Sequence, residues 1–473
     1  MSATRNSAYI IAAQMSLLFS GAIISFGLGR LLGPGLYGQF GVVFAVATII
    51  NLLITPGIMQ AVSKFSASDK KQAQAIAGSV LKKQFIISMI LALVYYFLAT
   101  PIAILLRDPE LADLFQFLTP LVVIYALSAV YGGYLTGIGK FSKQATQLIA
   151  YSSSRLILTF LLAYFFSLSG AILALPLAAF VALIYFAFVS KIKFAEYKTA
   201  SLYKFALPIT AFIGLITIFL SVDLFLVKTL LQDNSLTGYY TAASTIARIP
   251  YFVLTALGMV MLPAIAEKIA AKKDTKQFVQ GAFRYVLMLL IPSTIMISMT
   301  AKPLVMLLYR SEYAAAGLPL SVLTIGIAAL TLSYLFATVI NAIKPSLSAA
   351  TAAGVLVLSI TLNLTLIPRY YLVGAAIATT LTSILLMLIL FLIVYRKIGN
   401  PFNYSSLVKV ILASILIFVI ALQIDLQNKF FLPVLYALLW GIYFIALFVM
   451  KELKKEDFKR LLDLMPQRVN GFF

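Results

Sequence analysis

Apolar residues fill most of the chain in runs of about 20, and short polar or Gly/Pro-containing breaks separate the runs. A helix of this length, at about 1.5 Å per residue, crosses the hydrocarbon core of a bilayer. Residues 32–35 (LGPG) and 107–109 (RDP) are typical helix stoppers. The pattern predicts an all-α polytopic membrane protein with about 14 transmembrane helices. The predicted spans are 8–29, 40–62, 84–106, 114–137, 146–167, 170–190, 205–230, 238–263, 283–302, 317–341, 347–367, 372–395, 407–424 and 431–450.

The composition narrows the classes of function. Hydrophobic residues make up 62% of the chain and charged residues 11%, against about 25% charged in soluble domains. With no cysteine and no histidine, disulfides, Cys/His metal sites, thiol nucleophiles and imidazole acid–base chemistry are excluded. No hydrophilic block is long enough for a soluble catalytic domain. We therefore expect a protein that is not an enzyme and has no catalytic residue, cofactor or metal.

The charge distribution predicts the orientation. The net charge is +21, and most of the 36 lysines and arginines fall in alternate loops, on the same side as the N-terminus. The positive-inside rule places both termini in the cytoplasm and the protein in the cytoplasmic membrane. Because the basic residues lie at helix ends and in short loops, we expect membrane lipids and no nucleic acid as partners. The tail from Lys451 to Arg460, which includes Glu452, predicts a solvated amphipathic helix near anionic lipid.

A weak repeat runs through the chain at an offset of about 200 residues. Residues 37–40 (YGQF) correspond to 237–240 (TGYY), and 170–172 (GAI) to 374–377 (GAAI). The repeat holds six spans, an even number, so both copies have the same orientation and are related by an axis along the membrane normal. The repeat predicts two six-helix lobes around a central cavity. The predicted domains are 1–200, 201–400, and 401–473 with two extra transmembrane helices and a basic cytoplasmic tail.

An arginine, Arg248, lies near the middle of the eighth predicted span. A charge there costs at least about 2.5–3.5 kcal/mol on insertion scales, so it should face other helices or water. Thr241, Ser244, Tyr251 and Thr255 recur at spacings of three and four around it, which places hydroxyl groups on the same helical face. We expect this face to line the cavity.

A second arginine, Arg155, lies near the middle of the fifth span. Polar side chains share its face: Gln147, Tyr151, Ser152 and Thr159. A guanidinium offers a planar fork of donors that suits phosphate oxygens. The alternative is a structural arginine bonded to carbonyls or to a carboxylate. We predict a substrate-binding cavity that contains Arg155, Arg248, Tyr151, Ser244 and, at its rim, Arg30, which could instead be an interface anchor.

Asp223 is the only carboxylate within a predicted span. It could form a salt bridge with Arg155 or Arg248, or take part in coupling to Na+ or H+. Lys228, on the same span, is either part of the same arrangement or a lysine that snorkels to the interface.

Several segments resemble one family. They are residues 30–38 (RLLGPGLYG), Gly238-Tyr239-Tyr240, Ala247-Arg248-Ile249-Pro250, Leu262-Pro263, and Ile367-Pro368-Arg369-Tyr370 followed by Gly374. Over about the first 400 residues the chain resembles the polysaccharide/oligosaccharide flippase family of the multidrug/oligosaccharidyl-lipid/polysaccharide exporter superfamily. The resemblance implies a flippase that moves a lipid-linked oligosaccharide, on a polyprenyl phosphate or pyrophosphate carrier, across the cytoplasmic membrane by alternating access, for cell-surface polysaccharide biosynthesis.

Other functions stay open at this point. The cargo could be a lipid II-type peptidoglycan precursor, because related flippases share the pattern. A multidrug or cation exporter would want acidic cavity residues, and only Asp223 is available. A membrane glycosyltransferase usually needs a catalytic carboxylate or sizeable outer loops, and a scaffold would leave the intramembrane arginines unexplained. We expect a monomer, because a two-lobed unit needs no partner to form a cavity. We also expect transport to be coupled to the membrane potential, Na+ or H+.

Overall fold

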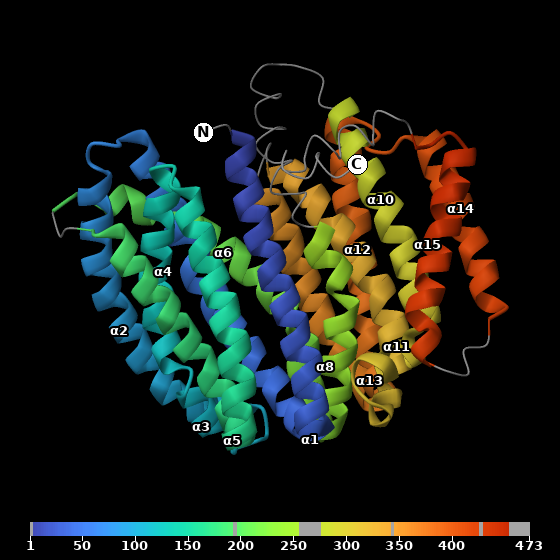
Figure 1. Cartoon of the computed structure of the whole chain (residues 1–473), viewed down its shortest axis with the longest axis horizontal. Helices are drawn as coiled ribbons and strands as arrows, with labels where there is room; N and C mark the ends of the chain where they lie inside the picture. Colours follow the sequence, from blue (N-terminus) through green and yellow to red (C-terminus); the bar gives the residue numbers. More distant parts are fainter. Residues whose placement is uncertain (1–2, 193–195, 255–275, 342–344, 425–428, 454–473) are drawn as a thin grey trace, which may run out of the picture. The chain divides into compact units, whose positions relative to one another are not determined.

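The computed structural model describes residues 3–192, 196–254, 276–341, 345–424 and 429–453, and these residues contain helices and no strand (Figure 1). The chain is a multi-pass, all-α membrane protein. Ten helical segments in this part of the chain are long and apolar enough to cross a membrane. The helices are α1 (Ala3–Ser68), α2 (Ala73–Leu105), α3 (Leu111–Gln116), α4 (Thr119–Gly137), α5 (Phe141–Ser190), α6 (Ala200–Phe219), α7 (Val222–Leu231), α8 (Asn234–Ala247), α10 (Lys276–Met299), α11 (Ala301–Leu308), η1 (Ser311–Ala316), α12 (Gly317–Asn341), α13 (Pro345–Ile398), α14 (Tyr404–Leu422), η2 (Lys429–Phe431) and α15 (Leu432–Val449).

Three of these helices each contain a sharp break, so each holds two of the predicted spans. The breaks are at Gly33 in α1 (φ 73°), Ser167 in α5 (φ 51°) and Tyr371 in α13 (φ 52°). A positive φ at Gly33 suits glycine, which has no side chain to clash. The predicted count of 14 stays a prediction, because much of the eighth span lies outside the described residues.

The breaks in α5 and α13 give the sequence repeat a structural counterpart. Ser167 and Tyr371 have nearly the same dihedral angles, with ψ of −131° and −132°. Three residues after each break stands a glycine that touches the preceding helix. A Cβ at Gly170 would lie 2.0 Å from the carbonyl oxygen of Leu162, and one at Gly374 would lie 2.2 Å from that of Leu366. The same local packing thus recurs at the positions that the repeat pairs.

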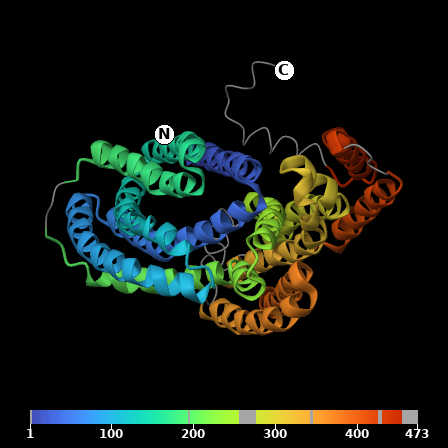
Figure 2. The ribbon, with the colours of Figure 1, turned by 90° about the horizontal axis from the view of Figure 1, so that it is seen from below.

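The helices form two compact units. Unit 1 contains the described residues up to Ser221 together with Gln232–Gly238, and unit 2 contains Val222–Leu231 and the described residues from Tyr239 onward. In unit 1 the core joins α1, α2, α4, α5 and α6 through side chains such as Val62, Ile76, Leu135, Phe186 and Leu202. Figure 2 shows the blue-to-green helices of this unit from below. The predicted limits 1–200, 201–400 and 401–473 stay predictions.

The seventh predicted span, 205–230, is two helices rather than one. α6 ends at Phe219 and α7 begins at Val222. Backbone N–H groups of Leu220 and Ser221 donate to the carbonyls of Ile216 and Ile218, both at 3.0 Å, and close the last turn of α6. Neither Leu220 nor Ser221 is a residue that typically ends a helix, so the hydropathy pattern predicts one continuous helix across the break. As a result, Asp223 lies in the first turn of a short helix.

The two C-terminal helices are fastened to α10 by charged groups. Just beyond α15, the Glu452 carboxylate accepts a hydrogen bond from the Arg284 Nε at 2.6 Å and lies 3.4 Å from the Lys409 Nζ. The Ser406 hydroxyl also donates to it, at 2.5 Å, and the Arg284 guanidinium donates to the Glu452 carbonyl. Glu452 is 6% exposed. The expectation of a solvated helix is therefore wrong at Glu452, because three donors from α10 and α14 surround it; residues 454–460 lie outside the described residues.

Glu452→Gln is expected to lower the stability of the protein by about 2 kcal/mol, because it removes the charge from a buried, charge-assisted hydrogen-bond cluster. Burial opposes ionisation, but hydrogen bonds from Ser406 and Arg284 outweigh it, so the pKa of Glu452 lies below its usual value. The stability that ionised Glu452 contributes is therefore fully present at pH values above the ordinary carboxyl pKa. It is lost as the pH falls through the lowered pKa of Glu452. Thermal unfolding in detergent across this pH range should show the wild type converging on the variant in acid.

Glu312→Gln, at an exposed position, is the control and should leave the unfolding temperature unchanged. Equal stability of Glu452→Gln and wild type at neutral pH would contradict the role given to the cluster.

Candidate functional site

Arg155 is buried in the first half of α5, within unit 1. It is 7% exposed, and its guanidinium carbon lies 5.1 Å above the centre of the Phe44 ring of α1. Its Nε has no hydrogen-bond partner among the described residues, and the same holds for the Thr159 hydroxyl one turn further along α5. The Ser152 hydroxyl, on the same face, is 2.7 Å from that of Ser16 in α1 and fixes the two helices together. Arg155 is thus a buried cation with donor capacity left over.

Two tyrosines lie beside Arg155. The Tyr151 hydroxyl, predicted from the sequence, lies near that of Tyr125 in α4, and the Arg155 charge acts on Tyr125. Both side chains are partly exposed. Sequence spacing identifies Tyr151 because it shares a helix with Arg155. It could not identify Phe44 or Tyr125, which come from other helices.

Asp223 is held at the start of α7, within unit 2, and is 2% exposed. Its Oδ2 accepts hydrogen bonds from the Tyr240 hydroxyl of α8 at 2.7 Å and the Thr379 hydroxyl of α13 at 3.2 Å. Its Oδ1 accepts one from the backbone N–H of Leu224 at 2.8 Å. Tyr240 belongs to the quoted segment Gly238-Tyr239-Tyr240, and Thr379 to the hydroxyl-rich run 379–383 within an apolar span.

Arg248 follows α8 directly and pairs with Asp223. Its Nη2 lies 3.9 Å from the Asp223 Oδ1, which is longer than a hydrogen bond, and its side chain is 21% exposed. The helical path continues past it, because the backbone N–H of Arg248 donates to Ser244 and that of Phe252 donates to Arg248, both at 3.1 Å. Within unit 2 the structure thus pairs Asp223 with Arg248.

The remaining predicted residues differ in their surroundings. Ser244 is 6% exposed and its hydroxyl donates to the backbone carbonyl of Thr241 at 3.1 Å. Lys228 is 2% exposed, so its side chain does not snorkel to the interface. Arg30 is exposed near the end of the first half of α1. Thr255 lies outside the described residues.

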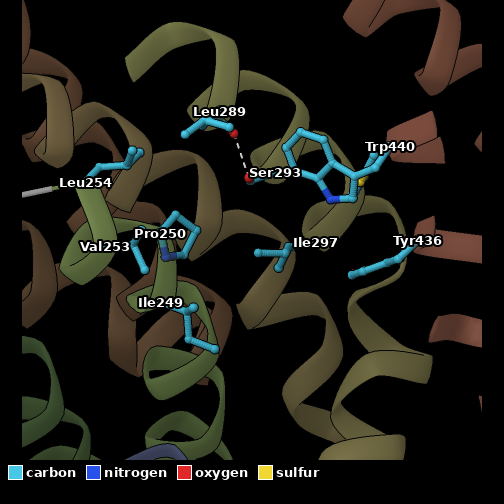
Figure 3. A pocket seen from close by; sticks show the side chains of 10 residues that line it. Ile249, Pro250, Val253, Leu254, Leu289, Ser293, Ile297, Tyr436 and Trp440 are labelled. Carbon is cyan, nitrogen blue, oxygen red and sulfur yellow. Dashed lines mark hydrogen bonds between the residues drawn. The ribbon is translucent and has the colours of Figure 1, made fainter. Parts of the chain in front are cut away.

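An apolar pocket of about 300 Å³ begins at the residues that follow Arg248 (Figure 3). It is lined by the helical segment 249–254, by α10 and by α15, which supplies Tyr436 and Trp440. Two hydroxyl groups at its edge have hydrogen-bond partners. The Ser293 hydroxyl donates to the Leu289 carbonyl at 2.6 Å, and the Tyr436 hydroxyl lies 2.7 Å from that of Thr300. The pocket therefore offers apolar surface.

Comparison with known proteins identifies the family. Residues 28–318, more than half of the chain, match the family described as polysaccharide biosynthesis protein. The chain belongs to this family. Among relatives, it is 24% identical to the uncharacterized membrane protein MJ1375 of Methanocaldococcus jannaschii over 417 residues, which cover 82% of this chain and 97% of that one. It is 22% identical to MJ1068 of the same organism over 241 residues, about half of each chain.

Solved structures with the same fold come from one transporter superfamily. The lipid II flippase MurJ in an inward closed conformation superposes with a TM-score of 0.78 at 18% identity, covering 92% of this chain and 98% of MurJ. An inward-facing multidrug resistance MATE family transporter of the MOP superfamily superposes with a TM-score of 0.68 at 15% identity, covering 82% of this chain and 98% of that transporter. This family member therefore has the multi-helix fold of MurJ and the MATE transporters.

Proposed function

We propose that the protein is a flippase that moves a lipid-linked oligosaccharide, on a polyprenyl phosphate or pyrophosphate carrier, across the cytoplasmic membrane by alternating access. The observation that carries the proposal is Arg155, a nearly fully buried cation on a membrane-spanning helix whose Nε has no partner among the described residues. A buried donor without an acceptor costs free energy unless a ligand supplies the acceptor. A phosphate group is the acceptor that a guanidinium matches best.

The sign of the charge within the predicted spans favours an anionic cargo. Among the described residues of these spans, Arg155, Arg248 and Lys228 bring three positive charges, and Asp223 is the one carboxylate. A multidrug exporter for cations would need the opposite balance. The family description, polysaccharide biosynthesis, and the fold shared with a protein named a lipid II flippase both support a polyprenyl-linked sugar. Beside Arg248, the pocket of Figure 3 offers an isoprenoid chain a mostly apolar surface.

The test is flipping of a fluorescent polyprenyl-pyrophosphate oligosaccharide in liposomes that contain the purified protein. Reduction of the outward-facing dye by dithionite reports the fraction that has crossed. We expect flipping above that of empty liposomes, and none of a neutral glycolipid with the same glycan and no phosphate. Failure with polyprenyl phosphate and pyrophosphate glycans, together with efflux of a cationic dye, would overturn the proposal in favour of an exporter. A lipid II probe in the same assay separates the two cargo classes.

A further inference from the structure

Asn51, in the second half of α1, is a partly exposed amide within an apolar helical segment. Its Oδ1 accepts a hydrogen bond from the Thr55 hydroxyl at 2.8 Å, and its amide nitrogen donates to none of the described residues. The hydrocarbon of a bilayer offers no acceptor, so an exposed amide in a span needs water or a ligand. Asn51 stands two turns after Phe44, over whose ring Arg155 lies, and is therefore on the same side of α1.

α4 packs against this half of α1 in a fixed register. A Cβ at Gly133 would lie 2.6 Å from the carbonyl oxygen of Met59, and one at Gly137 would lie 2.7 Å from that of Ser63. The second contact lies one turn further along both helices, so the two helices run in the same direction. Residues that precede the first contact by the same distance on each helix therefore lie at the same level.

Asn51 and Tyr125 are such a pair, because each stands about two turns before that contact. The Tyr125 hydroxyl lies near that of Tyr151 in α5, and the Arg155 charge acts on Tyr125. Like Asn51, both tyrosines are partly exposed. Three helices of unit 1 thus bring three partly exposed polar groups close to the buried guanidinium. We call Asn51, Tyr125 and Tyr151 the polar trio.

From this arrangement we propose that the polar trio binds the sugar next to the phosphate in the transported lipid. The inference rests on the proposed function, because the phosphate binds at Arg155. Amide groups and tyrosine hydroxyls both donate and accept hydrogen bonds, as the hydroxyl groups of a sugar do. A tyrosine also offers a ring on which the apolar face of a sugar can lie. Along α1, Asn51 lies about 10 Å from Phe44, which leaves room for a phosphate at Arg155 and one sugar ring beside it.

The proposal makes the polar trio a determinant of specificity. The phosphate and the isoprenoid chain are common to polyprenyl-linked cargoes, whereas the sugar differs between them. A site that forms hydrogen bonds with a substrate hydroxyl discriminates against an analogue that lacks it, because the polar groups of the site then stay unpaired. Removing a member of the trio should therefore abolish the contribution of the sugar and leave that of the phosphate.

The experiment measures binding of four probes to the purified full-length protein in detergent by isothermal titration calorimetry. Three probes are farnesyl pyrophosphate esterified with glucose, galactose or N-acetylglucosamine. The fourth carries a methyl ester instead, and so has the same charge and no sugar. The affinity for a sugar ester divided by that for the methyl ester measures the contribution of the sugar. In the wild type we expect this ratio to reach about tenfold for at least one sugar, as two net hydrogen bonds would give.

Asn51→Leu keeps the side-chain volume and removes the amide. The ratio should fall by about fivefold, the loss of one net hydrogen bond, while the affinity for the methyl ester stays at the wild-type value. Tyr125→Phe removes one hydroxyl, should lower the ratio in the same way, and serves where Asn51→Leu fails to fold. Thr361→Val is the control: this exposed threonine of α13 donates its hydroxyl to the Val357 carbonyl at 3.0 Å, and the variant should bind all four probes normally.

Equal affinity of the wild type for all four probes overturns the sugar site and leaves the phosphate-binding flippase standing. If the variants weaken binding of the methyl ester as much as that of the sugar esters, the polar trio shapes the site without contacting the sugar, and the proposal is wrong. A wild-type ratio in the folded variants shows that the sugar binds elsewhere. If no probe binds to the wild type, the proposed function itself has failed, and the sugar site fails with it.

Discussion

Replacing Arg155 with alanine is expected to reduce flipping of a polyprenyl-pyrophosphate oligosaccharide by about 30-fold or more, without loss of protein stability. The reduction corresponds to about 2 kcal/mol, the worth of a charge-assisted hydrogen bond to a phosphate. The stability of the variant should stay equal or rise, because the wild type buries a guanidinium whose Nε has no partner. Flipping in liposomes and thermal unfolding in detergent are measured on the same preparations.

This combination separates ligand binding from a structural role. A structural arginine would lower both the flipping rate and the unfolding temperature when removed. Arg155→Met keeps most of the side-chain volume over the Phe44 ring and should behave like the alanine variant in transport. Arg396→Ala, at an exposed position near the end of α13, is the control and should flip normally. Normal flipping by Arg155→Ala would contradict the role of Arg155.

Gly238→Val is expected to prevent folding or to destabilise the protein by about 3 kcal/mol, the upper part of the usual range for overpacking. The first turns of α8 pack against α1 at this glycine. A Cβ at Gly238 would lie 1.9 Å from the carbonyl oxygen of Pro34, and one at Gly38 would lie 2.1 Å from that of Asn234. Backbone meets backbone at both places, so no flexible side chain can move aside. Yield of monodisperse protein and the unfolding temperature measure the effect.

The control for this prediction is Gly281→Ala in α10. A Cβ at Gly281 meets no atom within 4 Å. Alanine there gains helix propensity at no steric cost, so the unfolding temperature should stay the same or rise slightly. Wild-type stability of Gly238→Val would show that α1 and α8 can separate at this crossing without cost.

Arg155 and Arg248 differ in their surroundings. Arg155, in unit 1, is buried and its Nε has no hydrogen-bond partner among the described residues, whereas Arg248, in unit 2, is 21% exposed and pairs with Asp223.

The sequence by itself determined the membrane character, the helical class, most of the spans and the positions of Arg155, Arg248 and Asp223 as charges within apolar helical segments. These features are local: hydropathy over about 20 residues and a period of 3.6 residues suffice to predict them. The repeat also emerged from the sequence, and the matched breaks at Ser167 and Tyr371 agree with it. The break between α6 and α7 did not emerge, because the sequence has no glycine or proline at Leu220 and Ser221 to indicate it.

Only the tertiary structure decided which groups meet. Asp223 pairs with Arg248 and accepts hydrogen bonds from Tyr240 and Thr379, which lie far apart in the sequence. Glu452, expected in solvent, is buried because Arg284, more than 150 residues before it, supplies its charge partner. In a bilayer every helix is apolar on most of its surface, so hydropathy does not distinguish one packing partner from another. Close packing between segments that are distant in sequence therefore determines which polar groups pair across helices. A local sequence pattern contains no information about that packing.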